Sequence, residues 1–383
     1  MLDSIYKFFT SVRLAVVLLA LGLILVFWGT IAQVKLGLYM AQDEFFRSLF
    51  IYWRPNGSTL RIPIFPGGYL IGGLLLINLF AAHLRYYKSG FRRLGIAMIH
   101  LGVVMLLLGQ FATDMLSVES QMTIREGEAS NYSESSSRWE LAIIDASGEK
   151  DNGVVAIPAS LLMKRRELAH ADMPFKLRPV KFHINSALSE TNETSSYELV
   201  KAENSAGRQV WWNALPKETR MNFRDIPSGV VELIGPAGES RAVLVSGYIS
   251  RPFTVTAGGR ELQLVLRPER YYKPYRLHLI DFRFDRYAGT DKPKNFSSRV
   301  RLERPETGES REVTIRMNEP LRYDGKTFFQ ASFDKETELS TVLQVVDNPG
   351  WLTPYFACVM VSVGMIWQFL VHLIGFAAKR KTA

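Results

Sequence analysis

The segment Leu94–Thr113, LGIAMIHLGVVMLLLGQFAT, contains 20 residues without a charge and decides the class of fold. A hydrocarbon core of about 30 Å requires about 20 predominantly apolar residues of helix. Three other uncharged segments reach this length, with 21 residues between Arg13 and Lys35, 23 between Arg61 and Arg85, and 31 between Asp347 and Lys379. The chain of 383 residues is therefore predicted to carry four transmembrane helices.

Charge is distributed unevenly along the chain. Residues 114–347 contain 33 Lys+Arg and 34 Asp+Glu, a net of −1, while the remaining segments contain 13 basic and 3 acidic residues, a net of +10. The sum is the overall +9. The basic excess thus belongs to the flanks of the apolar segments, which indicates membrane lipid and excludes a nucleic-acid footprint.

The long polar segment has the period of β-strands. Trp139, Leu141 and Ile143 alternate with their neighbours, and two apolar runs flank the glycine turn Gly258-Gly259, which is typical of a hairpin. We therefore predict an α+β membrane protein in which a large extracytoplasmic β-rich domain, a sandwich or an open barrel, is inserted between helices 3 and 4.

The predicted boundaries follow from these patterns. Residues 1–116 hold helices 1–3 at about 14–34, 64–84 and 94–114, residues 117–347 form the β-rich domain, and 348–383 form helix 4 with a short basic tail. The stretch Met40–Trp53 mixes apolar and charged residues, so it is either a short interfacial helix or an irregular loop.

Basic residues predict the orientation. Four spans put both termini and the loop Arg85–Arg93, which holds four basic residues including Lys88 and no acidic one, on the same side. Dense Lys and Arg in short loops marks the cytoplasmic side. We expect a multi-pass protein of the bacterial inner (cytoplasmic) membrane, N-in and C-in, with the large domain on the periplasmic, outer side.

Motifs for catalysis are lacking in the sequence. Cys358 is the only cysteine, which excludes an intrachain disulfide, a CxxC redox pair and a CxxCH haem-attachment site. The chain also contains no Walker loop, HExxH or GxSxG motif. We therefore predict no catalytic residue.

Histidines are the remaining candidates for chemistry. His170, His183 and His278 lie in the β-rich segment, where we expect structural or surface roles. The uncharged segments contain the other three, His83, His100 and His372, and an ionisable side chain in a membrane helix usually has a function or a partner.

Counting from flanking charges estimates their depth. His100 is seven residues from Arg93 and His372 is seven from Lys379, which predicts a matching depth of about 10 Å, whereas His83 is two residues from Arg85 and is expected near the surface. Neutral imidazole is a good axial ligand for haem iron. A hydrogen bond to a neighbouring helix is the alternative role for each of them.

Three sets of motifs resemble the ResB (CcsB-type) family of System II cytochrome c biogenesis. The first runs from Phe8–Ala15 to Gly29-Thr30-Ile31-Ala32-Gln33, with Ala32 where proline is frequent. A second joins Arg92-Arg93-Leu94-Gly95 and His100-Leu101-Gly102 to Glu119–Gly127. The third comprises Asp281-Phe282, Met317–Leu321 and Gly325–Asp334, followed by Gln344–Gly350. Residues from about 130 to 250 carry no such motif.

This resemblance implies a function and a set of partners. It implies a membrane subunit that binds haem b non-covalently and, with a CcsA-type partner, delivers it across the membrane to apocytochrome c. His100 matches the family's haem ligand, which would make it the metal ligand through the haem iron. His372 or the partner would supply the second ligand, and Arg92 and Arg93 would meet the propionates. The subunit would be non-catalytic within a holocytochrome c synthase complex.

A different class of function is also compatible with the sequence. In this alternative the chain is a scaffold that recruits apocytochrome and stabilises the partner without binding haem. The motif Met317–Asp334 is interpreted as architectural, with turns at Asn318 and Gly325 and phenylalanines in a core. Trp211-Trp212-Asn213 lies in the unmatched region and is not the tryptophan-rich loop of the partner family.

Overall fold

The computed structural model describes residues 2–53, 55, 60–86, 90–148, 152–191, 196–205, 207–218, 224–289, 293–334 and 339–382. Lys88 of the basic loop lies outside these residues. The chain divides into two compact units, one of Met1–Ser117 with Asn348–Ala383 and one of Val118–Glu218 with Phe223–Asp347.

The first unit is helical. Its helices are α1 (Leu2–Phe9), α2 (Val12–Ala41), the π-helix η1 (Gln42–Phe46), α3 (Gly68–Tyr86), the 3-10 helix η2 (Phe91–Arg93), α4 (Leu94–Leu116) and α6 (Thr353–Thr382). Four segments, Val12–Leu38, Gly68–Arg85, Phe91–Leu116 and Thr353–Arg380, are long and apolar enough to cross a membrane. The expected set of four apolar helices is therefore present.

The second of these helices starts later than the sequence predicted. Ile62–Pro66 forms strand β2, which pairs antiparallel with β1 (Phe50–Trp53), and α3 begins only at Gly68. Proline lacks the amide hydrogen and disfavours helix in the residue before it, so Pro63 and Pro66 favour the extended conformation. Of the two forms predicted for Met40–Trp53, a short helix is present in part, since the segment ends α2, forms η1 and then enters β1.

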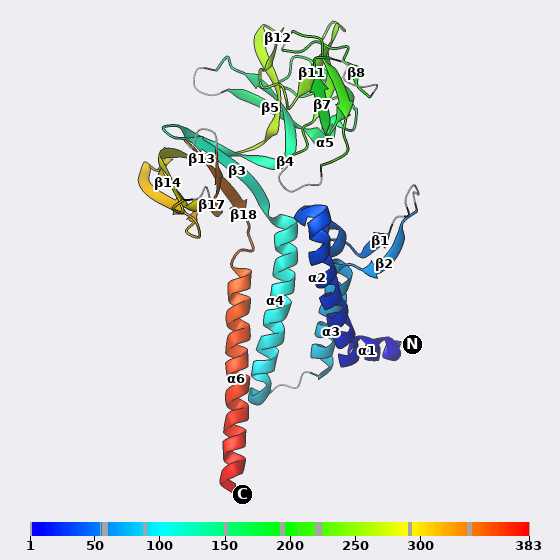
Figure 1. Cartoon of the computed structure of the whole chain (residues 1–383), viewed down its shortest axis with the longest axis vertical. Helices are drawn as coiled ribbons and strands as arrows, with labels where there is room; N and C mark the ends of the chain where they lie inside the picture. Colours follow the sequence, from blue (N-terminus) through cyan, green and yellow to red (C-terminus); the bar gives the residue numbers. More distant parts are fainter. Residues whose placement is uncertain are drawn as a thin grey trace. The chain divides into compact units, whose positions relative to one another are not determined.

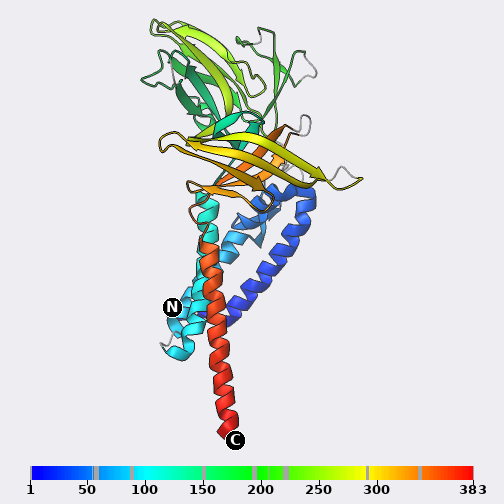
Figure 2. The same ribbon diagram turned by 90° about the vertical axis from the view of Figure 1, so that its left-hand side faces the viewer.

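Helices α4 and α6 pack closely and lie side by side in both views (Figures 1 and 2). Three buried glycines spaced by seven residues, Gly95, Gly102 and Gly109, face α6. A Cβ on Gly95 would lie 2.6 Å from the carbonyl oxygen of Gly364, so the two backbones touch here. Small residues at such crossings are what allows membrane helices to approach closely.

The second unit is built almost entirely of strands. They are β3 (Val118–Arg125), β4 (Ala129–Asp145), β5 (Gly153–Pro158), β6 (Lys176–His183), β7 (Ser186–Ser189), β8 (Glu198–Leu199), β9 (Trp211–Ala214), β10 (Ser228–Ile234), β11 (Ser240–Ser246), β12 (Phe253–Ala257), β13 (Arg260–Arg286), β14 (Pro293–Arg304), β15 (Glu309–Arg316), β16 (Leu321–Tyr323), β17 (Lys326–Phe333) and β18 (Ser340–Asp347). The short helix α5 (Ala159–Leu162) follows Pro158, within the helix predicted for 159–168.

Ten strands form the main sheet, in the order β15-β14-β13-β4-β3-β18-β17-β16, with β12 on β13 and β5 on β4. The sheet curls until its ends meet: β15 contacts β16 and β17, and the hydroxyl of Tyr323 donates to Glu309 at 2.6 Å. The result is a nearly closed barrel, in agreement with the predicted β-rich class. Two three-stranded sheets, β11-β10-β6 and β7-β9-β8, complete the unit.

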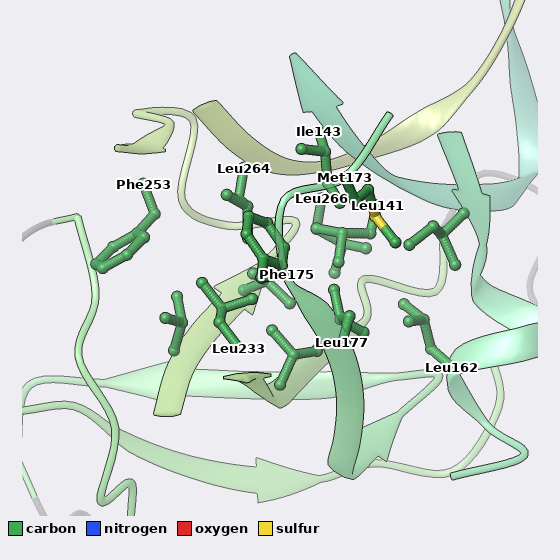
Figure 3. Packing of buried hydrophobic residues seen from close by; sticks show 14 of the residues in the cluster. Leu141, Ile143, Leu162, Met173, Phe175, Leu177, Leu233, Phe253, Leu264 and Leu266 are labelled. Carbon is green, nitrogen blue, oxygen red and sulfur yellow. The ribbon is translucent and has the colours of Figure 1, made fainter. Parts of the chain in front are cut away.

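Two hydrophobic cores share the long strand β13. The first core contains Leu141 of β4 and Leu264 of β13 and is covered by β6, β10 and β11 (Figure 3). The second fills the barrel around Leu277 and Phe328, both fully buried. Strand β13 therefore runs from one core into the other.

Candidate functional site

Two histidines of the first unit lie side by side on neighbouring helices. His83 is in the last turn of α3 and His100 is in the second turn of α4, and both side chains are half-buried. Their ring centroids are 5.9 Å apart and the ring planes make an angle of 74°. The structure thus brings together two imidazoles that the sequence placed at different depths.

The different depth was predicted because Arg85 was taken as the edge of the membrane segment. Its guanidinium instead donates to the hydroxyl of Thr10 at 2.5 Å and lies 5.6 Å from the ring centroid of Tyr6. Arg85 is held against α1 within the helical unit. Counting residues from Arg85 therefore placed His83 too close to the end of the packed helices α3 and α4.

One ring nitrogen of His100 has no hydrogen-bond partner among the described residues. This atom, Nδ1, is buried. A buried polar atom without a partner costs about 1–3 kcal/mol. Since a neutral imidazole has one donor and one acceptor nitrogen, the open position suits a metal bond or a hydrogen bond to a group outside this chain.

The glycine face of α4 determines where His100 points. Gly102 follows His100 by two residues, which is about 200° around a helix of 3.6 residues per turn. Because Gly102 faces α6, His100 points to the opposite side of α4, toward α3. Helix α6 therefore fixes α4 from behind, and the imidazole lies on the side of α4 that faces α3.

His372 is not brought to this pair. Gly102 contacts Val361, so His100 lies near the level of Val361, and His372 is eleven residues further along α6, about 16 Å. Its Nδ1 is within 2.8 Å of the carbonyl oxygen of Gln368 on the same helix. The matching depth expected for His100 and His372 is therefore wrong, since α6 extends further beyond the packed region than α4 does.

Arg92 and Arg93 are exposed in the turn η2, which leads into α4. This turn is anchored to α6, because the indole of Trp367 donates to the carbonyl oxygen of Phe91 at 3.0 Å and the two rings are 4.4 Å apart. Arg93 precedes His100 by seven residues, about 10 Å along the helix. The two guanidinium groups are thus near the histidine pair without contacting it.

A cavity of about 900 Å³ lies at the opposite end of the same helices. Three glycines of α3 and three apolar side chains of α4 are among the residues that line it. At its polar edge Asp114 accepts a hydrogen bond from the hydroxyl of Tyr69 and lies 2.7 Å from the guanidinium of Arg47. No sequence pattern predicted this cluster, because Asp114 was considered only as the end of an uncharged segment.

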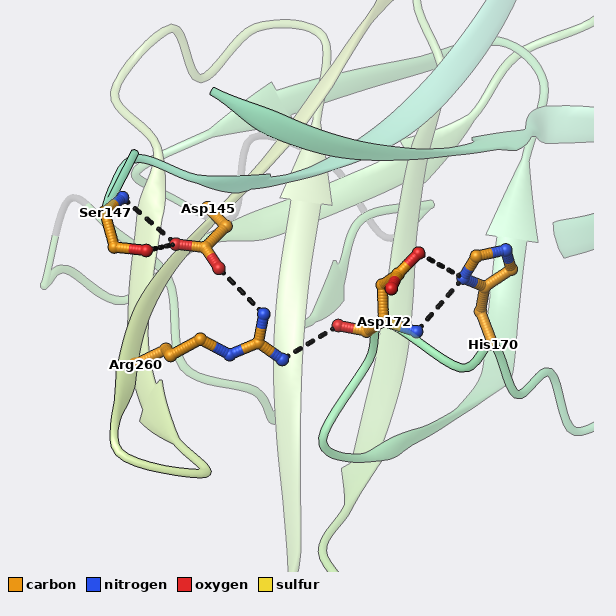
Figure 4. Close-up of polar contacts among 5 residues, drawn as sticks. All are labelled: Asp145, Ser147, His170, Asp172 and Arg260. Atoms are coloured by element: carbon orange, nitrogen blue, oxygen red, sulfur yellow. Dashed lines mark hydrogen bonds and ion pairs between the residues drawn. The ribbon is translucent and has the colours of Figure 1, made fainter. Parts of the chain in front are cut away.

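Polar groups in the second unit serve mainly to connect its segments. Arg260 donates to the carboxylate of Asp145 at 2.8 Å and to the carbonyl oxygen of Asp172 at 3.0 Å (Figure 4). Hydrogen bonds from Ser147 lower the pKa of Asp145. His170 accepts from the amide of Asp172 at 3.3 Å, so this histidine has a surface role, as expected.

Buried charges lie where β4 and β13 pair. Arg267 and Glu140 form an ion pair at 3.0 Å with only 9% and 7% of their side chains exposed. The ammonium of Lys273 donates to Ser133 at 2.7 Å, and burial lowers the pKa of Lys273 to about 8. Both groups are satisfied by neighbours on the partner strand, which identifies them as parts of the sheet.

The motif Met317–Asp334 has an architectural place in the barrel. Asn318 and Gly325 have positive φ angles of 66° and 74°, in the turns before β16 and β17. Phe328 is fully buried in the barrel core. Trp212 in the unmatched region is also buried, and its ring packs 4.9 Å from that of His183.

Comparison with known proteins supports the sequence resemblance. Residues 250–341, from the end of the first core through most of the barrel, match the ResB-like family. The chain is also similar to Protein NrfI of Wolinella succinogenes, with 25% identity over 307 residues, which are 78% of this chain. This chain spans about 29% of the length of that relative. The predicted resemblance is confirmed by these two matches.

Proposed function

Because this chain is ResB-like over residues 250–341, we propose that it is a membrane subunit of cytochrome c biogenesis that binds haem b within the membrane. The observation that carries the proposal is His100, a half-buried imidazole among apolar helices whose Nδ1 has no partner among the described residues. A group outside the chain would provide the missing partner, and haem iron is suited to accept the lone pair of an imidazole nitrogen.

The chemistry of this region fits haem as cargo. The apolar faces of α3 and α4 would exclude water and contact the porphyrin, whereas His100 would bind the iron. Arg92 and Arg93 would pair with the propionates through charge-assisted hydrogen bonds. His372 is the weaker candidate for a second ligand, because it lies about 16 Å further along α6 than the level of His100.

Orientation and partners complete the proposal. The termini and η2 would face the cytoplasm and the β-rich unit the periplasm, so haem would enter from the cytoplasmic leaflet. A CcsA-type partner would receive it and present it to apocytochrome c, with the β-rich unit shaping the outer chamber. The chain itself would be non-catalytic in that complex.

The test is purification of the chain together with a CcsA-type partner, followed by absorption spectroscopy and an assay of cytochrome c maturation. We expect His100→Ala to lower haem occupancy and maturation at unchanged protein abundance, because alanine fits a membrane helix but provides no metal ligand. Added imidazole should partly restore both.

The control separates ligation from packing. If His100 only packs against its neighbours, its loss should lower abundance or partner association, and imidazole should have no effect. Full haem content and full maturation in His100→Ala would refute the proposal. The scaffold that recruits apocytochrome and stabilises the partner would then be the better description.

A further inference from the structure

We propose that the cavity beside Asp114 binds one neutral membrane amphiphile with a planar head that carries carbonyl groups, which is the chemistry of a membrane quinone. All residues that line this cavity of about 900 Å³ belong to the first unit. Neither His83 nor His100 is among them. The inference therefore does not depend on haem and adds a second ligand to the proposed function.

The shape of the cavity suits a flat ring. Gly72 and Gly73 of α3 both line it, and apart from the local helix no heavy atom lies within 4 Å of the Cβ position of either glycine. Because glycine has no side chain, a planar group can approach the backbone of α3 closely here. The volume is in the range of about 300–1,000 Å³ that is usual for pockets that bind small molecules.

Apolar side chains form the walls and lead toward lipid. Phe46 of η1 and Leu107, Leu108 and Phe111 of α4 line the cavity. Leu108 and Phe111 are 49% and 51% exposed, in a helix that is long and apolar enough to cross a membrane. A hydrocarbon tail attached to the bound head can therefore leave the cavity along an apolar surface.

The polar edge favours a head without net charge. Arg47 lies 2.7 Å from Asp114, and the hydroxyl of Tyr69 donates to the same carboxylate. Arg47 and Asp114 are the charged residues among the described residues that line the cavity, and their charges compensate each other. An anionic phospholipid head would have to compete with Asp114 for the guanidinium, whereas a neutral head leaves this ion pair intact.

Three carboxamides provide hydrogen bonds for such a head. Gln33 of α2, Gln42 of η1 and Gln110 of α4 line the cavity, and within the described part of the chain no hydrogen bond joins their side chains to another residue. Gln33 and Gln110 belong to segments apolar enough to cross a membrane, where an unpaired polar group is costly. A carboxamide donates and accepts, so these groups can pair with the carbonyl oxygens of a quinone.

The experiment incubates the purified full-length chain in detergent with decylubiquinone and an excess of phosphatidylglycerol and phosphatidylethanolamine. Native mass spectrometry then identifies each bound molecule by its mass. We expect one decylubiquinone per chain in the presence of both lipids. Gly72→Leu and Gly73→Leu should each weaken this binding at least about fivefold, because the new side chain occupies the space of the ring.

Gly375→Leu is the matched control. Gly375 also lies in a membrane helix with nothing within 4 Å of its Cβ position, but it does not line the cavity, so binding should be unchanged. Gln110→Leu tests the polar edge and should weaken binding about threefold to tenfold, the effect of one hydrogen bond. Gel-filtration profiles and circular dichroism spectra like those of the wild type show that each variant is folded.

The outcomes separate a quinone site from a lipid site. Equal decylubiquinone binding by the wild type, Gly72→Leu and Gly73→Leu would overturn the proposal, as would the absence of bound decylubiquinone. Binding of a phospholipid alone, lost in the same two variants, would make the cavity a lipid site and would also overturn it. Haem occupancy enters none of these results, so this proposal and the proposed function can fail separately.

Discussion

Substitution of Gly102 by alanine tests the packing that holds α4 in place. The new Cβ would lie 2.6 Å from Cγ2 of Val361 and 2.9 Å from the carbonyl oxygen of Ala357, whereas ordinary van der Waals contact begins at 3.4 Å. The helices would have to separate by about 0.5–0.8 Å, because the second of these atoms belongs to the backbone and cannot rotate away. Overpacking of this kind destabilises by about 1–3 kcal/mol.

Gly73→Ala is the matched control. Gly73 is also inside a membrane helix, but nothing lies within 4 Å of its Cβ position. Both substitutions gain the same helix propensity, up to about 1 kcal/mol, so their difference isolates the steric term. We expect Gly102→Ala to unfold at a lower SDS fraction than the wild type in a titration followed by circular dichroism, and Gly73→Ala to unfold at the same or a higher fraction. Equal stability of the two variants would refute the close α4–α6 contact.

Three further predictions concern the second unit and the topology. Glu140→Gln should destabilise the β-rich unit by about 3–5 kcal/mol in urea unfolding, because it leaves a buried arginine unpaired. Glu312→Gln, in an exposed ion pair, is the control and should change stability by less than about 1 kcal/mol. Equal effects of the two substitutions would contradict the role of burial. Because the folded pKa of Lys273 is about 8, below that of the unfolded chain, the unfolded state binds more protons between about pH 8 and pH 10 and stability should rise with pH there. Lys273→Met should flatten that rise, and an unchanged slope would exclude Lys273 as its source. Reporters fused after Ser205 and after Lys381 should be periplasmic and cytoplasmic respectively, and the reverse would invert the proposed orientation.

The elements of the fold could be predicted wherever one periodicity dominates a segment. The uncharged runs predicted four apolar helices, and the glycine turn at Gly258-Gly259 predicted the β12–β13 hairpin, which is present. The start of α3 could not be predicted in this way, because Ile62–Pro66 is as apolar as the helix it precedes. Only its prolines distinguish it from the helix.

The candidate site shows what distances along the sequence cannot provide. His100 was identified by its place in a family motif, but the proximity of His83 depends on how α3 and α4 cross. Arg85 was misleading, because its guanidinium donates to Thr10 and lies against α1 instead of marking the end of the helix pair. The buried pair of Glu140 and Arg267 was equally invisible, since charged residues in an alternating strand ordinarily indicate the exposed face.

The pairing of β4 with β13 contains two irregularities that cancel. The numbers of two paired residues add up to 407 for the pairs from Leu262↔Asp145 to Pro268↔Trp139. They add up to 404 for the pairs from Arg270↔Glu134 to Tyr272↔Tyr132, and to 407 again at Leu277↔Ser130. Strand β4 therefore has three extra residues at the first offset, and β13 has three at the second.

Because the two offsets cancel, the side chains of β13 point to the correct side in both cores, although neither strand is regular. An odd offset exchanges the two faces of a strand, so a deletion at one bulge alone would turn the barrel residues of β13 inside out relative to β4. Insertions and deletions in this stretch are therefore tolerated only in compensating pairs. The segment between β5 and β12 takes no part in this pairing, so a change in its length leaves the register of β4 and β13 as it is.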